Sequence, residues 1–164
     1  KKEGLFNLLG VSIYTNDELK ELIEDNEIDL IQMPFNMLDN FSLRGELMQK
    51  AKEKGKTIHS RSAFLQGLFF KNLDEKHKVV QSLNPQLLKI SEIAKKENVS
   101  ISTLALNYCL MQPYIDKVLI GVDSLAQLKS NLEASEYNLK AKLVQAINQI
   151  HVQNIDLLNP SLWN

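Results

Sequence analysis

The sequence is poor in cysteine and proline and has no long apolar run. The single cysteine, Cys109, excludes an internal disulfide and is compatible with a reducing compartment, so we expect a cytoplasmic protein. Closely spaced pairs of Cys or His, which structural zinc sites use, are missing, and we expect no metal site. No apolar run reaches the ~18 residues of a membrane-spanning helix, and no signal peptide is visible.

An excess of charge of one sign is also missing. The chain has 19 Lys and Arg against 20 Asp and Glu, for a formal net charge of −1. This balance does not provide the basic surface that nucleic acids or anionic membranes require. A length of 164 residues with 44% hydrophobic content predicts a single globular domain over residues 1–164 with a sizeable core.

Short apolar segments alternate with amphipathic segments along the chain. We predict strands over residues 7–12, 28–34, 56–62 and 117–122, and helices over 15–25, 42–55, 84–100, 100–113, 124–135 and 140–150. Strands that alternate with helices favour parallel pairing through right-handed crossovers. The predicted fold class is therefore α/β, built from parallel βα repeats.

Several helix ends carry local signals. Thr15 and Glu18 have the spacing of a capping box, and Gly55 is typical of a helix C-terminus. Asn84, directly before a proline, and Ser100 are expected to cap the next two helices. Ser124 is expected to begin the helix that follows the last predicted strand.

Polar residues interrupt the predicted strands near their carboxyl ends. They are Ser12 in the first strand, Gln32 in the second, and Arg61 and Ser62 in the third. Ligands of parallel α/β proteins bind at this edge of the sheet. Polar side chains on successive strands would all reach one pocket there.

Four segments resemble, in order, the second half of the aldo/keto reductase barrel. They are GVSIYTNDEL (10–19), IDLIQMPFNMLD (28–39), HSRSAFLQGLFF (59–70) and LIGVDSLAQLKSNLEA (119–134). The resemblance implies that the four βα units correspond to strands five to eight of a TIM (βα)8 barrel. It also implies that the chain is the cofactor-binding C-terminal portion of an NAD(P)H-dependent oxidoreductase.

The resemblance assigns the cofactor-binding positions. Ser12 and Gln32 would hydrogen-bond the nicotinamide carboxamide, because a hydroxyl and an amide match a neutral amide partner, and Arg61 would lie against the ring. The pyrophosphate would be bordered by Ser62, Phe64 and residues 66–68, including Gly67. The adenosine end would be lined by Gly121, Asp123, Ser124, Gln127 and Asn131, at a helix N-terminus.

Three positions depart from the pattern of the family. Ile13 stands where an asparagine is usual, so one carboxamide contact is missing. Arg61 replaces a stacking aromatic residue and places a positive charge beside a ring that is cationic when oxidised. Asp123 would repel a 2′-phosphate and suits ribose hydroxyls, so it favours NAD, whereas the family implies NADP.

The catalytic Asp, Tyr, Lys and His of the family come from the first four strands, and we predict no catalytic residue in this chain. We expect His59 to be a core histidine with its hydrogen bonds satisfied, and Tyr108 and Cys109 to lie in the core. His77 and His151 lie in polar surroundings and are expected to be solvated.

Four strands leave two open edges, and the chain does not begin with Met. We therefore expect the C-terminal part of a longer reductase, which associates with the missing N-terminal half or with itself. The complete enzyme would bind a nicotinamide dinucleotide and a small carbonyl substrate. One alternative is a non-catalytic, reductase-like half barrel that acts as an interaction or regulatory module. Another is an open doubly wound sheet that binds a mononucleotide or a phosphorylated ligand; this is disfavoured because no glycine-rich phosphate loop follows the first predicted strand.

Overall fold

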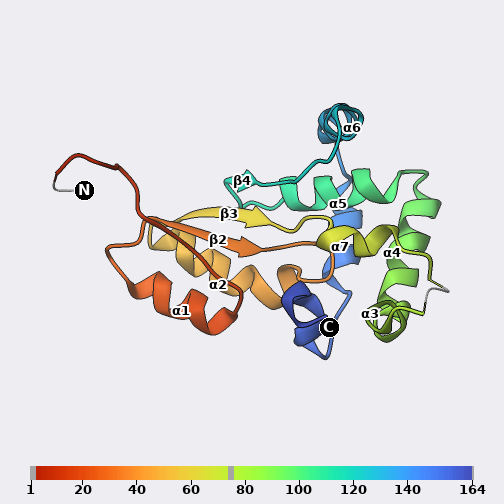
Figure 1. Ribbon diagram of the computed structural model, residues 1–164, viewed down its shortest axis with the longest axis horizontal. Coiled ribbons are helices and arrows are strands. Elements are labelled where there is room, and N and C mark those ends of the chain that lie inside the picture. The colour runs from red at the N-terminus through yellow and green to blue at the C-terminus, as the bar shows by residue number, and fades with distance from the viewer. Residues whose placement is uncertain (1–2, 74–75, 164) are drawn as a thin grey trace.

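The computed structural model describes residues 3–73 and 76–163 and contains one parallel sheet. The strands are β1 (Gly10–Ser12), β2 (Leu30–Pro34), β3 (Thr57–Arg61) and β4 (Lys117–Val118), and they pair in sequence order (Figure 1). A doubly wound sheet reverses its strand order partway, whereas a barrel adds strands consecutively. The parallel α/β class is confirmed, and the order is that of four consecutive barrel units.

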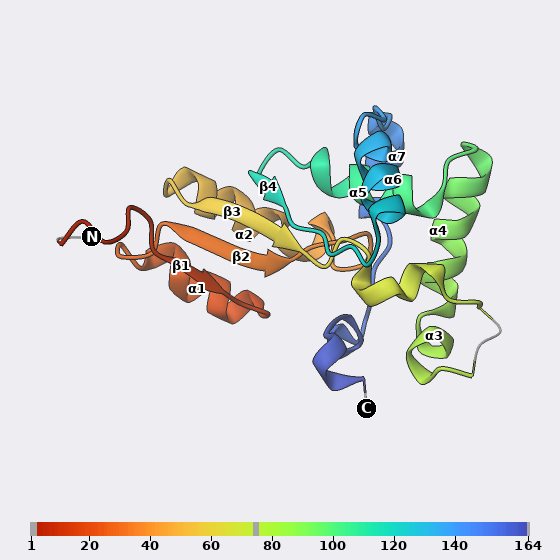
Figure 2. The same ribbon diagram turned by 45° about the horizontal axis from the view of Figure 1, so that its top comes forward.

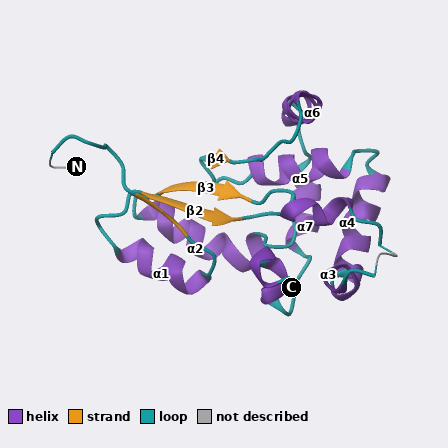
Figure 3. Cartoon of the chain, in the orientation of Figure 1, coloured by secondary structure: helices purple, strands orange, loops and turns teal. Residues whose placement is uncertain are grey.

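Helices connect and follow the strands (Figure 3). The α-helices are α1 (Asn16–Glu24), α2 (Phe41–Glu53), α3 (Lys78–Ser82), α4 (Asn84–Lys96), α5 (Ile101–Leu110), α6 (Leu125–Ser135) and α7 (Ala141–Asn148). Three 3-10 helices are η1 (Leu65–Phe70), η2 (Ile155–Leu158) and η3 (Pro160–Leu162). The sequence did not predict α3 or the 3-10 helices, because short segments lack a full apolar period.

The cap signals are largely confirmed. The Thr15 hydroxyl accepts from the Glu18 backbone N–H at 3.2 Å, while the Glu18 carboxylate accepts from the Thr15 N–H at 2.7 Å. Hydrogen bonds to its carboxylate from the backbone N–H groups of Tyr14 and Thr15 hold the pKa of Glu18 below its usual value. Gly55 has φ +75°, as a C-terminal glycine requires.

Some predicted boundaries were wrong. β1 begins at Gly10 rather than at residue 7, and β4 ends at Val118 rather than at residue 122. Both are outer strands of the sheet, so their pairing extends only as far as one neighbour supports it. Leu83, not Asn84, precedes α4, because the Asn84 amide instead donates to the Leu73 carbonyl at 3.2 Å.

The two faces of the sheet differ in burial. Ile31, Met33 and Ile58 are fully buried on the face toward α1 and α2, which lie along one side of the strands in Figures 1 and 2. Gln32 and His59 alternate with them and are only half-buried. Helices α1 and α2 therefore cover one face of the sheet, as helices cover the outside of a barrel, and the other face is more open.

Tyr108 and Cys109 lie in the core, as predicted. The Tyr108 ring stacks on Phe35 with 5.5 Å between centroids, and its hydroxyl donates to the Asn148 side chain at 2.6 Å. Burial raises the pKa of the Tyr108 phenol and of the Cys109 thiol. Both groups therefore stay neutral and serve packing.

A buried ion pair joins the first two βα connections. The Arg44 guanidinium donates to the two Asp39 carboxylate oxygens at 2.6 and 2.9 Å. It also donates to the Asn16 side chain and to the Tyr14 carbonyl, each at 2.8 Å. The bidentate pair orients Arg44, and its hydrogen bonds to Asn16 and Tyr14 fix the β1–α1 turn against α2.

His151 is exposed, as predicted, but His77 is not fully solvated. The His77 ring meets the Trp163 ring edge-on at 6.0 Å, because the C-terminal segment folds back onto it. Among the helices of residues 3–73 and 76–163, none is long and apolar enough to cross a membrane.

Candidate functional site

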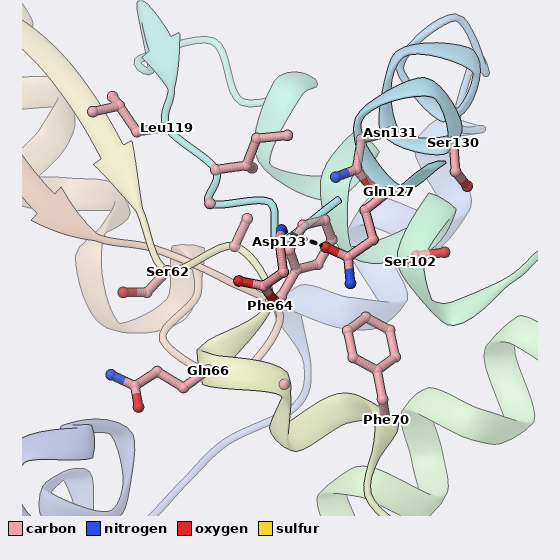
Figure 4. A pocket seen from close by; sticks show the side chains of 14 residues that line it. Ser62, Phe64, Gln66, Phe70, Ser102, Leu119, Asp123, Gln127, Ser130 and Asn131 are labelled. Atoms are coloured by element: carbon pink, nitrogen blue, oxygen red, sulfur yellow. Dashed lines mark hydrogen bonds between the residues drawn. The ribbon is translucent and has the colours of Figure 1, made fainter. Parts of the chain in front are cut away.

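A pocket of about 680 Å³ opens beyond the carboxyl ends of β3 and β4 (Figure 4). It is bordered by η1, by the turn that leads from β4 into α6, and by the first turns of α6. The lining residues are Ser62, Ala63, Phe64, Gln66, Gly67, Phe70, Ser102, Leu119, Ile120, Gly121, Asp123, Gln127, Ser130 and Asn131. They include one carboxylate and neither lysine nor arginine.

The β3–η1 wall of the pocket is built from unusual backbone conformations. Ser62, Leu65 and Gln66 have φ of 62°, 45° and 49°, and Gly67 has φ of 79°. Left-handed conformations of residues other than glycine are uncommon and cluster at functional sites. Two short hydrogen-bonded turns, from the Leu65 N–H to Ser62 and from the Gly67 N–H to Phe64, hold this path at 2.9 Å each.

The opposite wall is the N-terminus of α6. The Ser124 hydroxyl caps the helix by accepting from the Gln127 N–H at 3.1 Å, and the Asp123 N–H donates to the Gln127 side-chain oxygen at 2.7 Å. A Cβ added at Gly121 would meet nothing within 4 Å, so open space lies beside this backbone. The helix end therefore presents a partial positive charge to an accessible pocket.

A second group of polar residues crosses the more open face of the sheet. Ser12 pairs in register with Gln32, Gln32 with His59, and His59 with Lys117. Residues paired in adjacent strands point to the same face. The structure thus places Ser12 and Gln32 side by side, and it puts His59, which we expected in the core, half-exposed in the same row.

Arg61 is the last residue of β3, two positions after His59. Its guanidinium donates to the Ile13 carbonyl at 2.9 Å and lies 4.2 Å from the centroid of the Tyr14 ring. The side chain therefore reaches from β3 across β2 to the residues that follow β1. This cation–π contact and hydrogen bond occupy the guanidinium from two directions.

The structure divides the sequence-predicted site into two clusters. The pocket is lined by Ser62, Phe64, Gln66, Gly67, Gly121, Asp123, Gln127 and Asn131, and Ser124 caps the adjoining helix. Ser12 and Arg61 are the last residues of β1 and β3, and Gln32 lies in the middle of β2, paired in register with Ser12. Phe70, Ser102 and Ser130 also line the pocket but were not predicted, because their segments have only the patterns of ordinary apolar and helical structure.

In residues 3–73 and 76–163, no group of three or more His, Cys, Asp or Glu side chains is placed to hold a metal ion. The chemical groups that the pocket offers are amides, hydroxyls, one carboxylate, an aromatic pair and a helix N-terminus. These groups suit a polar organic ligand that carries both aromatic and anionic parts.

The chain is similar to two curated oxidoreductases. It is 24% identical over 153 residues to the NADH-specific methylglyoxal reductase of Escherichia coli, covering 85% of this chain and 47% of that protein. It is 25% identical over 144 residues to the uncharacterized oxidoreductase YqkF of Bacillus subtilis, covering 82% and 46%. The chain thus spans about half the length of these relatives.

Solved structures show the same fold. The apo form of the aldo-keto reductase AKR11C1 from Bacillus halodurans superimposes with a TM-score of 0.74 at 24% identity, covering 91% of this chain and 52% of that chain. The thermostable aldo-keto reductase Tm1743 gives a TM-score of 0.65 at 23% identity, covering 91% and 50%. The profile of the Aldo/keto reductase family matches residues 1–152, and the chain belongs to this family.

Proposed function

We propose that this chain forms the dinucleotide-binding part of an NAD(P)H-dependent reductase that converts an aldehyde or ketone to an alcohol. The observation that carries the proposal is the pocket between η1 and α6, which lies where ligands of parallel βα proteins bind. The eight predicted cofactor-binding residues that line it come from two segments more than fifty positions apart in the sequence.

The pyrophosphate would lie between η1 and the N-terminus of α6. The capped helix end offers the backbone N–H groups and the dipole that favour phosphate. Gly121 supports this placement, since open space beside its backbone allows close approach. The adenosine would continue along α6 toward Gln127 and Asn131.

The nicotinamide would lie over the carboxyl ends of β1 to β3. The Ser12 hydroxyl and the Gln32 amide, paired in register, offer the donors and acceptors that a carboxamide needs. Arg61 would pack against the ring, which requires its guanidinium to share or leave its contacts with Tyr14 and Ile13. A nicotinamide bound at this position would lie on the more open face of the sheet.

NAD is the dinucleotide that the pocket suits better. A 2′-phosphate needs cationic partners, whereas the lining residues offer the Asp123 carboxylate. A carboxylate can accept hydrogen bonds from ribose hydroxyls. One relative is described as NADH-specific, which agrees with this assignment.

The catalytic groups would come from four further βα units that complete the barrel around residues 1–164. The exposed apolar side chains at the β4–α6 end support this arrangement, because a complete barrel would cover them. They are Leu119, Val122, Leu125, Leu128 and Leu132, with exposed fractions from 38% to 66%. A tyrosine from those units would donate the proton while the nicotinamide donates the hydride.

A fluorescence titration of NADH with the full-length protein tests the proposal, with Gly121→Ala as the variant. The added methyl group meets open space in the protein, so the melting temperature should stay unchanged while NADH binding weakens about tenfold or more through a clash with the ligand. The 164-residue chain alone should not reduce an aldehyde. Turnover by this chain, or wild-type affinity of the variant, would contradict the proposal.

A further inference from the structure

Phe70 is an aromatic residue left exposed inside a pocket. Its side chain is 53% exposed, whereas the preceding Leu68 and Phe69 are buried. The Phe64 ring lies 5.8 Å away and is tilted by 47°, and both rings line the pocket. An aromatic ring held in this way offers a flat apolar surface to a ligand.

Two side-chain amides face the same space from α6. Gln127 and Asn131 are four residues apart, so both lie on one side of the helix, above Phe70 in Figure 4. The Gln127 oxygen is used by the Asp123 N–H, which leaves its NH2 group for a ligand. Within the described part of the chain, the Asn131 amide makes no hydrogen bond.

These three side chains match a purine base. The amide groups can pair with the amino group and ring nitrogens on the edge of adenine. The π-face of a base stacks on an aromatic ring. Ser102 and Ser130 complete the border with small polar groups that leave room for a flat ligand.

We infer that Phe70 is the stacking platform for the adenine in the proposed dinucleotide site. The inference deepens the proposed function and rests on it. Stacking on the Phe70 ring contributes affinity but does not discriminate between bases, because every base has a π-face. Selectivity for adenine comes from hydrogen bonds with the Gln127 and Asn131 amides.

Calorimetric titration of the full-length protein with ADP-ribose and, separately, with nicotinamide mononucleotide tests the inference. Phe70→Ala should weaken ADP-ribose binding about tenfold. Phe70→Tyr should stay within about twofold of the wild type because it keeps the ring, whereas Phe70→Leu, apolar but not aromatic, should fall near the alanine variant. Binding of the mononucleotide should be unchanged in all three variants.

Leu88→Ala is the matched control, because Leu88 is exposed to a similar extent (44%) on α4 and lies outside the pocket. It should bind ADP-ribose like the wild type. Wild-type affinity in Phe70→Ala, equal affinities in the tyrosine and leucine variants, or a parallel loss of mononucleotide binding would overturn the role of Phe70. A wild-type protein that binds neither ligand would overturn the proposed function itself.

Discussion

The wall formed by β2, β3, α1 and α2 is packed very differently from the end formed by β4 and α6. In the wall, Leu19, Ile31 and Met48 are fully buried, and a buried ion pair holds the connections together. In α6, by contrast, no residue is buried, and residues 121–130 are all exposed. The wall contains its own packing partners, whereas α6 displays an apolar surface beside the candidate cofactor pocket.

The two regions also differ in how they are attached. The Asn107 amide of α5 donates to the Ala134 carbonyl near the end of α6 at 2.7 Å, so the helix is tied to the protein at its C-terminal part. The N-terminal part of α6, which borders the pocket, is exposed to solvent and is not packed into the core. A region of this kind opens more readily than a packed wall.

The largest expected effect lies in the wall. Arg44→Met should lower the free energy of unfolding by about 3–5 kcal/mol, because it leaves the buried Asp39 carboxylate unpaired. Lys140→Met, which removes a 63%-exposed partner of Glu97 beyond α6, should leave the free energy of unfolding nearly unchanged. Urea denaturation of both variants measures this difference, and equal losses of unfolding free energy in the two variants would contradict it.

A pair of leucine truncations compares the two regions directly. Leu19→Ala should cost about 2–5 kcal/mol because it leaves a cavity in the wall. Leu132→Ala, at a side chain 60% exposed on α6, should stay within about 0.5 kcal/mol in the 164-residue chain. A clearly larger cost of Leu132→Ala in the full-length protein would show that further βα units cover this helix.

Asp123 gives a smaller effect at the exposed end. Asp123→Ser should shift the ratio of NADPH to NADH affinity toward NADPH by about fivefold, since removing one charge near a 2′-phosphate is worth about 1 kcal/mol. Asp17→Ser removes the same charge from α1 and should leave the ratio unchanged. An unchanged ratio in the Asp123 variant would count against the proposed placement of the ribose.

The smallest expected effect concerns the helix caps. Glu18 caps α1 with a carboxylate whose pKa is lowered on folding, so its contribution is present above its unfolded pKa and is lost as the pH falls through the folded value. Gln127 occupies the corresponding position in α6 and is neutral. Glu18→Gln should therefore lower stability by about 0.5 kcal/mol at pH 7 and by less at acid pH, where the carboxylate becomes protonated. Urea melts at both pH values test this, and a constant difference would contradict it.

The sequence predicts best what local chemistry decides. The Thr15–Glu18 capping box, the Ser124 cap and the four parallel strands follow from residues close together in the chain, and all are present. The family resemblance also named eight residues that line one pocket from separate elements, whereas Ser12, Gln32 and Arg61, predicted for the same site, lie outside that lining.

What the sequence could not predict depends on distant packing. The left-handed backbone of Leu65 and Gln66 has no local signal, because neither is glycine or asparagine. His77 was misplaced since Trp163, far along the chain, covers it. Phe70 was missed because an aromatic residue after GL fits an apolar core, and only the structure shows its exposed ring.

The unequal strand lengths bear on how the protein behaves at high concentration. The outer strands β1 and β4 have three and two residues, against five in each of β2 and β3. Short outer strands offer few backbone groups to a foreign strand, which limits the edge-to-edge growth that leads to fibrous aggregates. Contacts between molecules of the 164-residue chain alone should therefore form through side chains of α6 and remain reversible on dilution.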